Sequence, residues 1–180
     1  MRIALAALAM LGAACAQAGA QQQPPQQPPC SGPEFGQMDF WVGTWDVRWD
    51  AWPSSGIPAG RGTNTITRQL GACVIQEDFD GGPSVGGLLG RSVSLYHAQT
   101  RLWRQTWVDN QGGYFALTGG PEGDRFILTT TRLSEAVPQT RMVYQDITPT
   151  SLTWHWQRSN DGGVTWTDTW VIYYVRRGVP

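Results

Sequence analysis

The residues best suited to ligand chemistry lie in the segment 101–109, RLWRQTWVD. Its odd positions carry Trp103, Gln105 and Trp107, so a strand here would place two indoles and an amide on one face. Arg104 would then lie on the opposite face. Binding pockets combine apolar and aromatic walls with a few placed polar groups. With neighbouring segments included, we predict a ligand site formed by Glu77, Tyr96, Trp103, Arg104, Gln105, Trp107, Asp109 and Trp156.

The sequence gives little support for a catalytic centre. It contains no H-E-x-x-H or C-x-x-C motif, which are the local patterns of many metalloproteases and redox proteins. Glu77 and Asp109 could act as a carboxylate pair, but nothing in the sequence places them within catalytic reach. We therefore assign no catalytic residue.

Metal and cofactor sites are also disfavoured. The chain has only two histidines, His97 and His155, whereas most metal sites that use histidine need several ligands. One histidine could still bind haem iron axially, and His155, between Trp154 and Trp156, is the better candidate. The alternative is a hydrogen-bonded wall or surface residue, and we predict neither a metal nor a cofactor.

The elements that must position these residues are short strands separated by Gly, Asn and Asp turns. Short links of turn-forming residues make successive strands antiparallel neighbours, and closure of such a meander removes its exposed edges. We therefore predict an all-β fold, a closed antiparallel up-and-down β-barrel of about ten strands. The expected strands are Phe40–Trp49, Gly62–Leu70, Ala72–Phe79, Arg91–His97, Leu102–Val108, Tyr114–Thr118, Arg125–Thr131, Arg141–Ile147, Leu152–Arg158 and Thr165–Arg176.

Two connections have features of their own. The glycine-rich segment Gly81–Gly90 joins two expected strands and is either a long hairpin connection or a mobile lid at one mouth of the barrel. The run Ser159–Trp166, SNDGGVTW, resembles the Asp-box hairpin found in several unrelated β folds. In that hairpin the Ser and Asp side chains hydrogen-bond the turn backbone, so we assign Asp161 a structural role.

The N-terminus predicts export. Residues 1–20 combine an early arginine, a short apolar run and small residues ending in Ala-Gly-Ala, which is typical of a cleaved signal peptide and too short for a membrane span. Lipidation at Cys15 is an alternative. Residues 21–35 begin QQQPPQQPP and predict a flexible tether, followed by one domain at 36–180. We expect a periplasmic or extracellular protein.

Charge and cysteine content add two expectations. With 13 basic and 14 acidic residues and no basic cluster, the chain lacks the charge pattern that nucleic acid binding requires. In an oxidising compartment Cys30 and Cys73 are expected to form a disulfide, or else Cys30 is a free thiol in the tether and Cys73 is a small core residue. If they are bonded, closing the loop between them stabilises the folded state by about 4 kcal/mol.

Several motifs resemble those of a known group of barrels. Gly43-x-Trp45, with Arg176 and Arg177 near the C-terminus, is similar to the calycin signature of lipocalins, in which a first-strand Trp packs at the closed end under an Arg from the last strand. Five motifs along the chain resemble, in order and spacing, those of a bacterial family of exported lipocalin-like domains of unknown function. These motifs are DFWVGTWDV (39–47), LGACVIQE (70–77), GRSVSLY (90–96), WRQTWVD (103–109) and SNDGGVTW (159–166).

The resemblance covers about Asp39 to Arg176. It implies a small lipocalin-like β-barrel and no agreed activity. One departure is His97, where members tend to carry an acidic residue after the Tyr, and this weakens any site drawn around the following turn. We expect the tryptophan-rich chain to bind a small, partly apolar molecule. The alternatives are a small-molecule hydrolase or isomerase that uses a mouth carboxylate and an arginine, or an envelope-interaction domain with a filled barrel.

Overall fold

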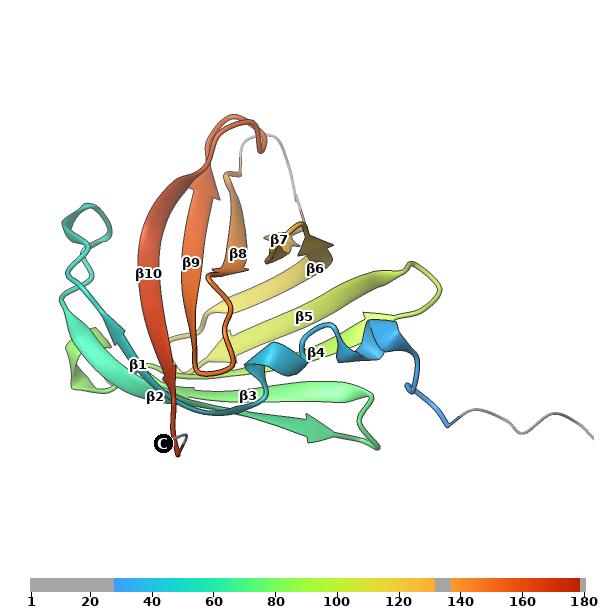
Figure 1. Cartoon of the computed structure of the whole chain (residues 1–180). Helices are drawn as coiled ribbons and strands as arrows, with labels where there is room; N and C mark the ends of the chain where they lie inside the picture. Colours follow the sequence, from blue (N-terminus) through green and yellow to red (C-terminus); the bar gives the residue numbers. More distant parts are fainter. Residues whose placement is uncertain (1–27, 132–136, 179–180) are drawn as a thin grey trace, which may run out of the picture.

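The computed structural model describes residues 28–131 and 137–178, so the predicted signal peptide, Cys15 and most of the tether lie outside it. The described residues form a closed barrel of ten antiparallel strands (Figure 1). This confirms the predicted fold class. The strands are β1 (Gly43–Trp49), β2 (Gly60–Gln69), β3 (Val74–Asp80), β4 (Leu89–His97), β5 (Leu102–Asp109), β6 (Tyr114–Glu122), β7 (Arg125–Thr130), β8 (Gln139–Gln145), β9 (Ser151–Ser159) and β10 (Thr167–Arg176).

Each strand pairs with the next along the chain, and β1 pairs with both β2 and β10. Trp45 lies opposite Asn64 of β2 and opposite Arg176 of β10, so the first and last strands close the barrel side by side. Each described strand therefore has a neighbour on both sides, and closure removes the free sheet edges at which chains aggregate. No helix in the described part of the chain is long and apolar enough to span a bilayer.

The segment before β1 closes one end of the barrel. We expected the first strand to begin at Phe40, but a short 3-10 helix, η2 (Asp39–Trp41), occupies this position. That expectation was wrong because the chain turns under the barrel here: Met38 and Trp41 are both completely buried. The preceding helix η1 (Pro33–Gly36) continues this cover. We call residues 33–42 the plug.

A disulfide and two arginines hold the plug in place. Cys30 is bonded to Cys73 in the turn between β2 and β3, which decides between the two alternatives left open by the sequence. Arg68 donates to the carbonyl oxygen of Phe35 at 2.9 Å and forms an ion pair with Asp39. Arg176 donates to the carbonyl oxygens of Val42 and Phe40. The plug is therefore tied to β2 and β10, the two strands that flank β1.

Gly43 makes the contact between the two ends of the sheet possible. The Arg176 guanidinium lies over the Trp45 ring, 4.0 Å from its centroid, as the resemblance implied. Gly43 has φ +144°, and a Cβ on it would lie 2.1 Å from Arg176 Nη1. Only glycine combines this conformation with such a close approach.

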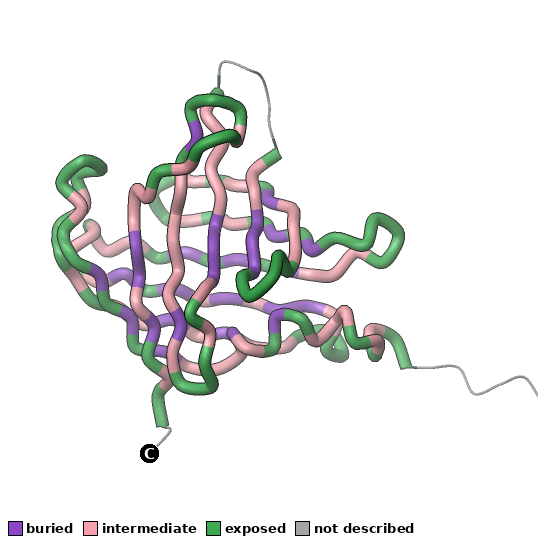
Figure 2. The backbone as a smooth tube through the Cα atoms, turned by 45° about the horizontal axis from the view of Figure 1, so that its top comes forward, coloured by how far each residue is buried: buried purple, intermediate pink, exposed green. Residues whose placement is uncertain are grey.

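The barrel interior has three levels from the closed end to the open end. Figure 2 shows the buried residues concentrated in the middle of the strands, with exposed loops at both ends. Aromatic side chains that include Trp41, Trp45 and Trp103 fill the closed end. Above them lies a buried polar layer, and above that the interior opens into a cavity. The polar layer consists of Asn64, Glu77, Ser92, Ser94 and Gln105.

Candidate ligand-binding site

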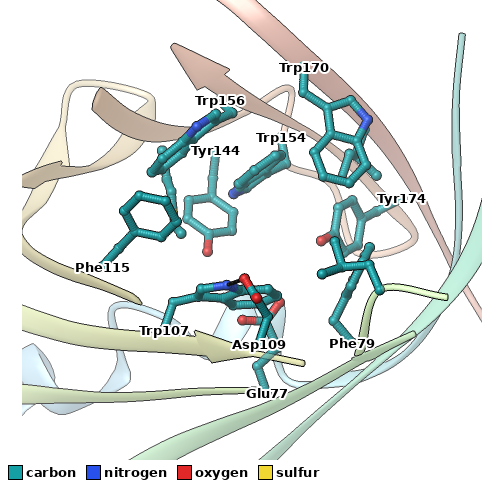
Figure 3. A pocket seen from close by; sticks show the side chains of 13 residues that line it. Glu77, Phe79, Trp107, Asp109, Phe115, Tyr144, Trp154, Trp156, Trp170 and Tyr174 are labelled. Carbon is teal, nitrogen blue, oxygen red and sulfur yellow. Dashed lines mark hydrogen bonds between the residues drawn. The ribbon is translucent and has the colours of Figure 1, made fainter. Parts of the chain in front are cut away.

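A cavity of about 140 Å³ lies at the open end of the barrel (Figure 3). Its walls are mainly aromatic, and its polar groups are two carboxyls, two phenolic hydroxyls and indole N–H groups. The described residues that line it are Glu77, Phe79, Leu88, Trp107, Asp109, Phe115, Met142, Tyr144, Trp154, Trp156, Trp170, Ile172 and Tyr174.

Strand alternation on β9 and β10 supplies one wall. Trp154 and Trp156 lie two residues apart on β9 and point into the barrel, where their rings stack 6.1 Å apart. On β10 the pairing shifts between Asp168 and Trp170, so that Trp170 lies opposite Trp156. This β-bulge places Thr169 outside the regular ladder and turns the Trp170 indole toward the cavity.

A glycine on β4 makes room for the opposite wall. Gly90 lies across from Asp109 on β5, and a Cβ on it would lie 2.0 Å from the Trp107 ring. The Trp107 indole therefore lies across the backbone of β4. Its orientation is fixed by a hydrogen bond of 2.9 Å from Nε1 to Asp109 Oδ2.

Asp109 is a fixed negative charge at the end of β5. Its Oδ1 accepts hydrogen bonds from the backbone N–H groups of Gln111 and Gly113, at 2.9 and 2.8 Å. Burial raises the pKa of this carboxyl, but the hydrogen bonds from Trp107, Gly113 and Gln111 together outweigh burial and leave the pKa below its ordinary value. Asp109 is therefore ionised at neutral pH.

Glu77 is a buried carboxyl where the polar layer meets the cavity. Asn64 Nδ2 donates to Oε1 at 2.7 Å and Ser92 Oγ donates to Oε2 at 2.6 Å. Burial raises the pKa of Glu77 to about 7, although both hydrogen bonds oppose the rise, and the charge of Asp78 raises it further. This carboxyl thus titrates near neutral pH.

Two tyrosines place neutral hydroxyls beside these carboxyls. Figure 3 shows the hydroxyl ends of Tyr144 and Tyr174 pointing toward the cavity. Asn64 Nδ2 lies 3.0 Å from Tyr174 Oη. Burial, reinforced by the charge of Glu77, raises the pKa of both phenols well above the ordinary value, so both stay protonated.

The structure brings together four of the eight predicted site residues. Glu77, Trp107, Asp109 and Trp156 all line the cavity. Gln105 faces the interior one level below, where its Nε2 donates to Ser94 Oγ at 2.9 Å.

Three predicted site residues lie elsewhere. Trp103 is buried at the closed end, where Nε1 donates to Gln37 of the plug at 3.0 Å. Tyr96 packs edge-on against Phe35 of the plug, with 5.3 Å between the ring centroids. Arg104 is exposed on the outer face of β5, because even-numbered residues of this strand point away from the interior. The cavity is therefore not lined by Arg104, the one arginine that we had assigned to the site.

Sequence reasoning missed most of the remaining wall, including Phe79, Phe115, Tyr144, Trp170 and Tyr174. The alternation of Trp170, Ile172 and Tyr174 was a usable signal that they share one face of a strand. It did not reveal that β10 reaches the same level of the barrel as Trp107.

Other candidates from the sequence lie outside the cavity. His155 points away from it, and its Nδ1 lies 3.1 Å from Asp168 Oδ1. Asp161 accepts hydrogen bonds from Ser159, Val164 and Thr165 within its own hairpin, which agrees with its predicted structural role. In residues 28–131 and 137–178, no cluster of three His, Cys, Asp or Glu side chains could hold a metal ion.

The glycine-rich connection forms part of the cavity rim. It contains the helix η4 (Pro83–Val85), and Leu88 after it lines the cavity. Gln111 and Asn110 of the next turn donate to the carbonyl oxygens of Val85 and Gly87, at 3.0 and 2.9 Å. These bonds join two loops at the mouth.

Comparison with known proteins adds nothing to this geometry: the sequence matches no model of a known protein family and no curated protein.

Proposed function

We propose that this protein is an exported binding protein that holds a small, partly apolar molecule in the cavity at the open end of its barrel. The observation that carries the proposal is the combination of aromatic walls with a few polar groups, which is the usual composition of small-molecule sites. The disulfide between Cys30 and Cys73 and the predicted signal peptide support an extracytoplasmic location.

The size of the cavity limits the ligand. A cavity of about 150 Å³ holds a benzene-sized molecule, and this one has about 140 Å³. The enclosed part of the ligand is therefore about the size of one aromatic ring. A longer group would extend through the mouth past Leu88.

The two alternative functions have weaker support. The enzyme alternative needs a carboxylate and an arginine at the mouth, but Arg104, the arginine assigned to it, lies on the outer face. Glu77 titrates in a useful range for proton transfer, but each of its oxygens already accepts a hydrogen bond. An envelope domain with a filled barrel would not need the cavity.

A ligand panel tests the proposal. Small monocyclic and branched aliphatic compounds, both neutral and charged, are added to the purified protein while tryptophan fluorescence and thermal unfolding are followed. A binder should change the emission of the indoles that line the cavity and raise Tm. If no compound in the panel changes either signal, the proposal is wrong.

A pair of neighbouring substitutions separates the cavity from other sites. Leu88→Trp places a larger side chain at the mouth, whereas Leu89→Trp makes the same change next to it at a residue 52% exposed on the outside. We expect Leu88→Trp to weaken binding by about tenfold or more and Leu89→Trp to leave it unchanged. Equal effects would place the binding site elsewhere.

A further inference from the structure

We infer that the ligand is an organic cation: an ammonium group attached to an apolar part about the size of one aromatic ring. This inference rests on the proposed function and names the chemical class that the same cavity selects. Two independent properties of the cavity carry it, the aromatic faces and the sign of its charges.

The aromatic faces are arranged around the space that a ligand would occupy. Figure 3 shows Trp107, Phe115, Trp154 and Tyr174 on different sides of the cavity. An ammonium group is attracted to the electron-rich faces of such rings, most strongly to Trp, and recognition of ammonium groups by aromatic cages is a common use of this attraction. Neutral apolar ligands would be held equally well by aliphatic walls, which contribute only Leu88, Met142 and Ile172 here.

The charges within the cavity have one sign. The described lining contains two carboxyls, Glu77 and Asp109, and no arginine or histidine. Asp109 remains ionised because three N–H groups donate to it. At the open end of the cavity this charge attracts a cation and repels an anion.

Three basic residues of the described strands lie outside the cavity. Arg48 lies over the Tyr173 ring at 4.4 Å, and Arg141 lies over the Trp166 ring at 4.2 Å, both away from the cavity. Arg91 pairs with Asp78 on the outer face. The chain has nearly equal numbers of basic and acidic residues, so the acidic interior results from their placement and not from an overall excess of acid.

The test compares cations with neutral molecules of the same shape. One pair is 2-phenylethylamine and 2-phenylethanol, and the other is choline and 3,3-dimethylbutan-1-ol. Binding to the purified protein is measured by titration calorimetry at neutral pH and constant ionic strength. The cation of at least one pair should bind about tenfold or more tightly than its neutral partner.

Matched substitutions locate the source of the preference. Glu77→Gln removes one carboxyl while its amide can still accept from Asn64 and donate to Ser92. Asp109→Asn removes the fixed charge. Asp78→Asn makes the same change on β3 but outside the barrel, beside Arg91. We expect at least one of the cavity variants to lose most of the cation preference, and Asp78→Asn to retain it.

The outcomes distinguish this inference from the proposed function. If the neutral partners bind as tightly as the cations, the inference is overturned and a neutral-ligand binding protein remains. If both cavity variants are folded and keep the full preference, the carboxyls of the cavity are not its source and the inference is overturned as well. If none of the four probes binds, the inference is also overturned. Failure of the wider ligand panel as well would overturn the proposed function.

Discussion

Glu77 shows how one carboxyl in the interior can be held without an ion-pair partner. In the structure it accepts one hydrogen bond on each oxygen, from Asn64 and Ser92, and it is only 5% exposed. Two neutral donors do not replace the hydration that the ionised form loses on burial. The folded protein therefore favours the protonated form of Glu77, with a pKa of about 7 against an ordinary value of 4.5.

This difference predicts a pH-dependent stability. Between pH 4.5 and about 7 the folded state binds more protons at Glu77 than the unfolded state, so this group lowers the free energy of unfolding as pH rises. The full penalty, about 3 kcal/mol, is present above the folded pKa and absent below the unfolded one. We expect the free energy of unfolding of Glu77→Gln, relative to that of wild type, to increase by about this much from acidic to mildly basic pH.

Urea unfolding across this pH range at constant salt measures the effect. The control is Asp78→Asn, because Asp78 lies on the outer face of the same strand and its hydrogen bonds to Gln76 and Arg91 hold its pKa below the ordinary value. The pKa of Asp78 is thus shifted in the direction opposite to that of Glu77. Unfolding curves of wild type and Glu77→Gln that stay parallel from acidic to basic pH would contradict the prediction.

At the scale of elements, the start of β1 depends on a single glycine. Gly43→Ala would force a positive φ on a residue with a side chain and push the Arg176 guanidinium off Trp45. We expect a loss of about 1–3 kcal/mol in the free energy of unfolding. Gly120→Ala on β6 is the matched control, because a Cβ there meets no atom within 4 Å. Equal stability of the two variants would show that the approach of Arg176 is unimportant.

Strand alternation also explains what could be predicted from the sequence. The existence of ten strands and the shared face of Trp103, Gln105 and Trp107 followed from period-two patterns, and the structure agrees. The level of each residue along the barrel did not follow. One strand spans the whole barrel height, so Trp103 lies at the plug and Trp107 at the cavity, a division that depends on closure and not on local pattern.

The alignment of strands that are distant in the sequence could not be predicted either. Tyr174 of β10 reaches Asn64 of β2, two residues separated by most of the domain. No residue type in the sequence indicates the bulge that turns Trp170 inward, because Thr169 is compatible with a regular strand. The four site residues that were found lie on strands where alternation alone decides the face, and the missed ones required knowledge of how the barrel closes.

At the scale of the whole molecule, the disulfide secures the closed end. Cys30 and Cys73 are 43 residues apart in the sequence, and a cross-link of this span reduces the entropy of the unfolded chain by the equivalent of about 4 kcal/mol. We expect the double variant Cys30→Ser, Cys73→Ser to unfold at a clearly lower urea concentration than wild type.

Reductant supplies the control for this prediction. Dithiothreitol should lower the urea midpoint of wild type toward that of the double variant and leave the double variant unchanged. A midpoint of wild type that is insensitive to reductant, although the thiols are shown to be free, would mean that the disulfide adds nothing to the contacts of Arg68, Arg176 and buried Met38 and Trp41 that hold the plug.

The plug also places the described ends of the chain relative to the mouth of the cavity. The chain enters the barrel through the plug, and β10 ends beside the start of β1, so both described ends leave from the side opposite the mouth. A surface or a second protein that holds the barrel by these described ends would therefore face its closed side, and the mouth would point away from it.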